Sequence, residues 1–104
     1  MFRHFASKVA SLTDLRVLYR RITERGIPIT IAVNHGCSLA FCFDDPERNM
    51  IEVYWPTDLH NGQPYGDPLD LEESDAGLVA EVAAIAERAG LSLPSTLVAT
   101  GTTP

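Results

Sequence analysis

The sequence has few basic residues and no long apolar run. Its 104 residues include 8 Lys and Arg against 14 Asp and Glu, which gives a formal net charge of -6. Nucleic acids and anionic membrane surfaces are bound through clustered cations, so this charge balance argues against both as partners. No stretch is apolar over the length that a membrane-spanning helix or a secretory signal needs. We therefore expect a cytoplasmic protein.

Cysteine is also scarce, since the chain contains only Cys37 and Cys42. On one continuous strand these two residues would point to opposite faces and lie about 16 Å apart, which is too far for a disulfide. We expect both thiols to be reduced, in agreement with the expected location.

The remaining composition is that of one small globular domain, with 45% apolar and 21% charged residues. Its first half predicts the element order βαβββ. A helix is indicated from Ser11, as N-cap, to Arg25, with Gly26 at its end and Pro28 beyond. Alternating or β-branched stretches predict four strands, which read FRHFASKV, IPITIAV, SLAFCFD and MIEVYW.

Alternation along these strands predicts one apolar and one polar sheet face. The helix would cover the apolar face, to which Ile29, Ile31 and Val33 are assigned. The opposite face would carry His4, Lys8, Thr30, Ser38, Cys42, Glu52 and Tyr54. Taken singly, Glu52 is most simply a solvated strand carboxylate and His4 a surface histidine. Their shared face is what makes the pair notable.

Residues 58–104 differ in composition from residues 1–57, and we place the boundary between two parts of the chain there. A Pro- and Gly-rich stretch predicts an extended arm with no strand of its own. A second helix is expected from about Ser74 to Ala89, with Ser74 as N-cap and Gly90 at its end. The last residues, STLVATGTTP, are expected to fray.

Two stretches carry a family resemblance. HFASKVASLTDLRVLYRRITERGIPI and NHGCSLAFCFDDPERNMIEVYW resemble one βαβββ module of the vicinal oxygen chelate superfamily, which includes glyoxalase I, bleomycin and fosfomycin resistance proteins and extradiol dioxygenases. The resemblance covers about residues 3–57 and is nearest to the C-terminal module of the dioxygenase-like members. It implies an α+β fold with a curved mixed sheet, to which this chain adds the arm and the C-terminal helix.

The resemblance also implies site residues. His4 from the first strand and Glu52 from the last strand of the module would bind a divalent metal, their strands being neighbours. His35 matches a histidine that helps to position or protonate substrate. Cys42 stands where the family usually has a substrate-contacting Tyr, and Arg48 where a turn Gly is usual. Lys8 and Tyr54 share the predicted polar face with these residues, and each would either contact the substrate or simply fill that face.

Family sites are built from two modules, and this chain contains one. Either it is a truncated piece that lacks a ligand, or two copies pair about a two-fold axis and supply His4 and Glu52 twice. The homodimer would act on a small catecholic or other vicinal-oxygen compound. Fe(II) or Mn(II) fits an extradiol ring-cleaving dioxygenase, and Zn or Ni a glyoxalase I-type lyase or isomerase. A resistance-type protein that binds a small molecule without metal is the third alternative.

Overall fold

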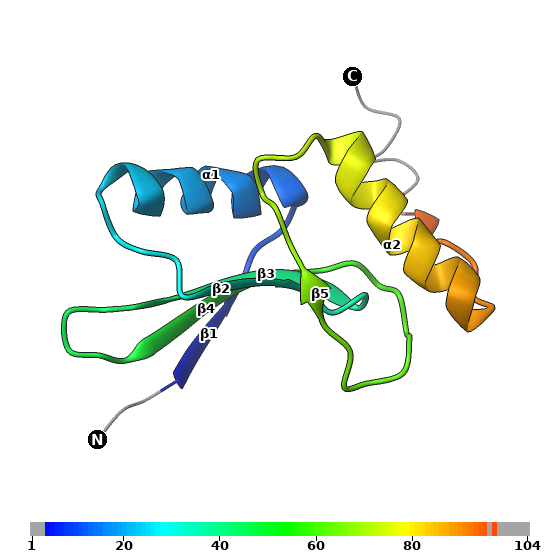
Figure 1. Cartoon of the computed structure of the whole chain (residues 1–104), viewed down its shortest axis with the longest axis horizontal. Coiled ribbons are helices and arrows are strands. Elements are labelled where there is room, and N and C mark those ends of the chain that lie inside the picture. Colours follow the sequence, from blue (N-terminus) through cyan, green and yellow to red (C-terminus); the bar gives the residue numbers. More distant parts are fainter. Residues whose placement is uncertain (1–3, 96, 98–104) are drawn as a thin grey trace.

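In the part of the chain that the structure describes, a five-stranded sheet is packed with the two helices α1 and α2 (Figure 1). The computed structural model describes residues 4–95 and 97. Its elements are β1 (His4–Lys8), α1 (Leu12–Glu24), β2 (Ile31–Asn34), β3 (Ser38–Asp44), β4 (Met50–Pro56), β5 (Asp67–Pro68) and α2 (Asp75–Ala89). The spatial order is β1-β4-β3-β2-β5, with β1 parallel to β4 and the other pairs antiparallel. The predicted α+β class and mixed sheet are confirmed.

Local signals define α1 as the sequence indicates. The Ser11 side chain accepts a hydrogen bond from the Asp14 amide at 3.0 Å, and Gly26 adopts a left-handed φ of 77° after the last turn. Leu12 and Leu15 are buried, and Leu18, Tyr19 and Ile22 pack against the core from the same helix. In Figure 1 α1 lies along one face of the sheet.

The covered sheet face is built from cross-strand apolar rows. Phe41 of β3 lies opposite Val53 of β4 and Ala32 of β2, and Leu39 lies opposite Trp55. Phe41 is fully buried, and the Tyr19 ring of α1 meets it edge to face at a centroid distance of 5.6 Å. This pairing fixes which residues of the strands face the core.

The prediction of which β2 residues face the core is wrong by one residue. Ala32, rather than its neighbours, packs against the core opposite Phe41, whereas Ile31 is 51% exposed. Ile29 still packs against the core, but it precedes the strand. Both faces of this stretch are apolar, so alternation could not show which of its residues face the core. The small Ala32 side chain leaves room for the Phe41 ring opposite it.

The turn between β3 and β4 keeps its register although Arg48 occupies a strained position. Arg48 has φ 65°, a region that glycine adopts without cost. The Asp45 side chain accepts hydrogen bonds from the amides of Glu47 and Asn49 and from the Asn49 side chain. The Asn49 side-chain bond is the main reason that the pKa of Asp45 is lowered. β3 and β4 then pair without interruption from Asp44 with Met50 to Ser38 with Pro56.

The arm, defined here as residues 58–73, is part of the packed structure. Contrary to the prediction, it contains a strand, since β5 pairs with β2 through Val33 and Asn34. Leu59, Leu69 and Leu71 of the arm are buried in the same core cluster as Leu39 and Trp55. The change of composition at residue 57 therefore follows the end of β4, but the core continues across it.

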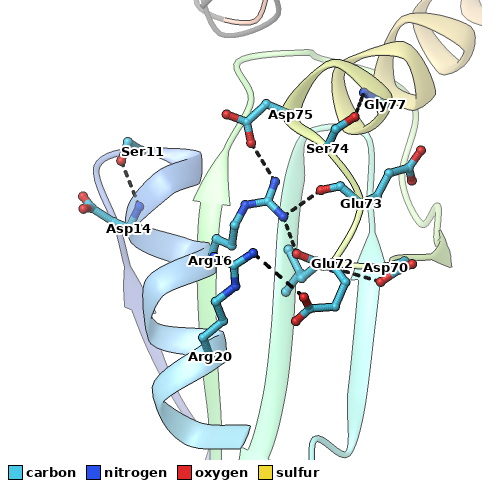
Figure 2. Close-up of polar contacts among 11 residues, drawn as sticks. Ser11, Asp14, Arg16, Arg20, Asp70, Glu72, Glu73, Ser74, Asp75 and Gly77 are labelled. Carbon is cyan, nitrogen blue, oxygen red and sulfur yellow. Dashed lines mark hydrogen bonds and ion pairs between the residues drawn. The ribbon is translucent and has the colours of Figure 1, made fainter. Parts of the chain in front are cut away.

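Arg16 of α1 fastens the end of the arm (Figure 2). Its guanidinium donates hydrogen bonds to the carbonyl oxygens of Leu71 and Glu73, the latter at 2.7 Å, and to Asp75 Oδ1 at 2.6 Å. One side chain thus holds two backbone carbonyls and the first residue of α2. Figure 2 also shows the longer contact of Arg20 with Glu72, at 3.9 Å.

The second helix has the predicted caps. Ser74 accepts a hydrogen bond from the Gly77 amide at 3.1 Å, and Gly90 is left-handed with φ 70°. Leu78, Val82 and Ile85 are buried on one stripe. Of the tail predicted to fray, Thr96 and residues 98–104 lie outside the described residues, whereas Leu97 is buried. In the part of the chain that the structure describes, neither helix has the length and apolar character needed to cross a membrane.

Candidate functional site

The sheet face away from α1 carries most of the residues that the sequence assigns to a site. Sheet register arranges them in cross-strand rows. One row consists of Ala6, Glu52, Cys42 and Ile31, and the next of Lys8, Tyr54, Ala40 and Val33. We call this surface the open face, because no helix of residues 4–95 covers it in Figure 1.

The two predicted metal ligands lie on neighbouring strands. His4 pairs with Met50, and Glu52 is two residues further along the same strand, so alternation gives His4 and Glu52 the same face. Strand spacings place their backbones about 8 Å apart. The His4 backbone belongs to β1, but its side chain lies outside the described residues. Glu52 is half-buried on the open face.

Cys42 lies beside Glu52 but is a poor candidate for contact with a ligand. It is 7% exposed. Burial raises the pKa of the Cys42 thiol, and the carboxylates of Glu52 and Asp44 raise it further. The thiol is therefore kept protonated and unreactive. Both cysteines are free, as predicted.

Tyr54 and Lys8 share the row next to Glu52. Tyr54 is half-buried between Lys8 and Ala40, whereas Lys8 is exposed as the last residue of β1. The phenol of Tyr54 thus borders the predicted metal ligands on one side, whereas Lys8, at the edge of the sheet, also lines a hollow beside α1. Their contact with substrate stays a prediction.

His35 lies in the turn between β2 and β3, where the arm holds it. Its Nδ1 atom is 2.8 Å from the carbonyl oxygen of Tyr65. Because a carbonyl can only accept, Nδ1 carries the proton of this bond, and in the neutral ring Nε2 is the unprotonated nitrogen. The His35 carbonyl accepts hydrogen bonds from the side chains of Asn61 and Gln63. The arm therefore fixes both the backbone and the tautomer of His35.

A hollow of about 750 Å³ adjoins this histidine and is otherwise lined by residues 63–66 of the arm. The His35 amide bonds to the carbonyl oxygen of Ser38, which lies four residues along β3 from Cys42. His35 is therefore about 13 Å along the sheet from the row of Glu52. Within one chain, His35 and Glu52 lie at different ends of the open face.

Gly36 next to His35 is required by its surroundings. It has φ 78°, and a Cβ atom there would overlap the Asn61 side chain. The buried Asn34 side chain accepts a hydrogen bond from the Gly36 amide at 2.8 Å, and the buried Thr57 hydroxyl donates a hydrogen bond to the Gly36 carbonyl oxygen. The turn that positions His35 is thus tied to β2, to the end of β4 and to the arm.

A single chain does not supply a complete metal site from the residues described. Among these residues no three His, Cys, Asp or Glu side chains lie close enough together to hold an ion. A site with two histidines and one carboxylate already needs three ligands. The donors His4 and Glu52 are of a suitable type, but further ligands would have to come from another module or chain.

Some residues of this region were not found from the sequence. Ile31 and Val33 were assigned to the core and instead add an apolar side to the open face. Asn61, Gln63 and Tyr65 lie in the stretch that was predicted only as an extended arm. The only signal for them was the concentration of Pro and Gly around them, which indicates a shaped loop without showing what it contacts.

Comparisons of the chain with protein-family models, with curated proteins and with solved structures found no match.

Proposed function

We propose that the chain provides one half of a metal-dependent, extradiol dioxygenase-like site that acts on a catecholic or other vicinal-oxygen compound. The observation that supports this proposal is the register of β1 and β4, which brings the backbones of His4 and Glu52 onto neighbouring strands two residues apart. Alternation along β1 would turn the His4 side chain toward the face of Glu52. The family resemblance of the sequence motifs supplies the reaction class. The second half would come from a second copy of the chain or another module.

A two-fold pair supplies the missing ligands most simply. Two copies that face each other across the open face bring two His4 and two Glu52 side chains, which is a sufficient donor set for a divalent ion. The exposed Ile31 and Met50 lie on the same face, so the pairing would also remove apolar surface from water.

The residues of the chain have distinct tasks in this proposal. A bound Fe(II) or Mn(II) ion would supply the Lewis acid and redox chemistry that ring cleavage needs. His4 and Glu52 would hold the ion, Tyr54 would border the substrate, and Lys8, which also lines the hollow beside α1, would lie at the edge of the site. His35 accepts a proton at Nε2 from a substrate hydroxyl that reaches its end of the face, while the Tyr65 carbonyl holds the Nδ1 proton.

A second candidate is a resistance-type protein that binds a small apolar molecule without metal. The apolar side chains of Ile31 and Val33 on the open face support this alternative. A glyoxalase I-type site would use the same His4 and Glu52 pair with Zn or Ni.

The direct test measures metal binding. Purified apoprotein is titrated with Mn(II) under anaerobic conditions and bound metal is followed by electron paramagnetic resonance. Glu52→Gln should weaken binding by more than the roughly 10- to 100-fold that loss of an outer-shell partner costs, because a ligand itself is removed. Glu47→Gln, which changes an exposed carboxylate in the nearby turn, is the matched control and should bind like the wild type.

Activity separates the reaction classes. The Fe(II)-loaded protein should consume oxygen in proportion to ring cleavage when a catechol is added. Metal binding that depends on Glu52 without oxygen consumption would favour the glyoxalase-type alternative. Unchanged metal binding in Glu52→Gln would refute the assigned ligand, and no binding of Fe(II), Mn(II), Zn or Ni would refute a metal site altogether.

A further inference from the structure

A second hollow lies where the end of β1 meets α1, and it includes neither of the predicted metal ligands. Its volume is about 490 Å³. Its charged wall is formed by Lys8, Asp14 and Arg21, and its apolar wall by Val9, Val17 and Leu18. We call this hollow the α1 groove. Its size is within the range of small-ligand sites in proteins.

One stripe of α1 forms the helical side of the groove. Asp14, Val17, Leu18 and Arg21 follow the spacing i, i+3, i+4 and i+7, which places them on one side of a helix. Val17 is 41% exposed although it is a large apolar residue. The helix thus presents an apolar strip between charged ends, rather than the fully polar surface expected for a solvated stripe.

Among the described residues, the two cations of the groove form no ion pair with a carboxylate, as is also true of Arg25 and Arg48. Carboxylates outnumber cations by 14 to 8. The guanidinium groups of Arg16, Arg20 and Arg88 each have a nitrogen within 4.0 Å of a carboxylate oxygen. Lys8, the only lysine, and Arg21 form no ion pair with the residues that the structure describes. Asp14 lines the same groove but is not within ion-pair distance of either.

We propose that the α1 groove binds a small monoanion with an apolar body, such as a medium-chain or aromatic carboxylate. Two cations and one carboxylate give the groove one net positive charge, which a single carboxylate group neutralises. The apolar body would lie on Val9, Val17 and Leu18 and remove them from water. A second anionic group would find no cation of its own and would lie near Asp14, and a neutral analogue would leave both cations without a counterion.

The test uses octanoate as the probe and 1-octanol as its uncharged counterpart. Titration of the 15N-labelled full chain with octanoate should shift the amide signals of Val9, Val17 and Arg21 with a saturable profile. 1-Octanol should bind at least about tenfold more weakly, because it lacks the charge. Arg21→Gln should weaken octanoate binding about five- to tenfold, and Lys8→Gln should act in the same direction.

Two further variants separate a groove from general attraction to a basic helix. Arg25→Gln removes an exposed charge one turn further on and should leave the affinity within about twofold of the wild type. Asp14→Asn should strengthen octanoate binding, because it removes the repelling carboxylate. Equal binding of octanoate and 1-octanol, equal effects of Arg21→Gln and Arg25→Gln, or no saturable shift would each overturn the proposal. None of these outcomes depends on metal binding at Glu52.

Discussion

Glu81 is the carboxylate of α2 whose surroundings most disfavour its charge. Desolvation raises the pKa of Glu81, and the nearby carboxylates of Glu73, Asp70 and Asp67 raise it further. The folded state therefore binds the Glu81 proton more tightly than the unfolded state. It follows that Glu81 lowers stability at neutral pH and that this penalty disappears as the pH falls through its raised folded pKa.

Replacing Glu81 by Gln should stabilise the protein at neutral pH. The gain should be small, at most about 0.5 kcal/mol, since this is an exposed surface position. Urea unfolding at several pH values should show the difference between variant and wild type closing as the pH falls through the raised folded pKa to the ordinary pKa of a glutamate. Glu87→Gln, a second exposed carboxylate of the same helix, serves as the control. A Glu81→Gln difference that stays constant with pH would contradict this explanation.

At single positions, the sequence showed which residues are unusual but not which backbone conformation they adopt. Arg48 was recognised as an unusual residue for its turn, and its positive φ agrees with that concern. The Asp45 side chain keeps the turn in place by accepting hydrogen bonds from residues two and four positions further on, Glu47 and Asn49. Such local side-chain bonds compensate for a residue that composition alone would count against the turn.

At the scale of elements, Arg16 is expected to join the arm to α1. Its side chain is only 12% exposed, and it donates to two carbonyls and to Asp75. Arg16→Ala should lower the free energy of unfolding by about 2–3 kcal/mol, because charge-assisted bonds in partly buried sites are lost. Thermal or urea unfolding measures this directly.

Arg20 provides a matched control on the next turn of the same helix. The side chains of Arg20 and Glu72 are 52% and 58% exposed, and their closest charged atoms are 3.9 Å apart. Arg20→Ala should therefore cost less than about 0.5 kcal/mol. Equal losses for Arg16→Ala and Arg20→Ala would show that Arg16 is no special connection between α1 and the arm.

The helices and main strands followed from the sequence because their signals are local. Ser11 and Ser74 cap the helices that they were expected to cap, and Gly26 and Gly90 follow the two ends. The face of β2 and the existence of β5 did not follow. Ala32 faces the core because Phe41 lies opposite it, and β5 forms because the arm returns to β2, so both depend on contacts between distant residues.

At the scale of the whole molecule, the candidate site also combines features that local sequence patterns predict with features that depend on contacts between distant residues. Alternation predicts His4 and Glu52 on one face, and the parallel pairing of β1 with β4 makes their strands neighbours. The position of His35 was not predictable, because it depends on the turn held by Asn61 and Gln63. The sequence therefore suggested the residue types of a site, while the structure separates His35 from the pair.

The central claim is that one chain carries half of a metal site and that a second copy completes it. Native mass spectrometry of the chain after addition of Mn(II) tests this most directly, because it reports chain and metal number together. We expect a dimer with one ion per two chains, and neither metal nor metal-dependent pairing for Glu52→Gln. One ion bound per monomer, or a dimer that takes up no ion, would contradict the claim.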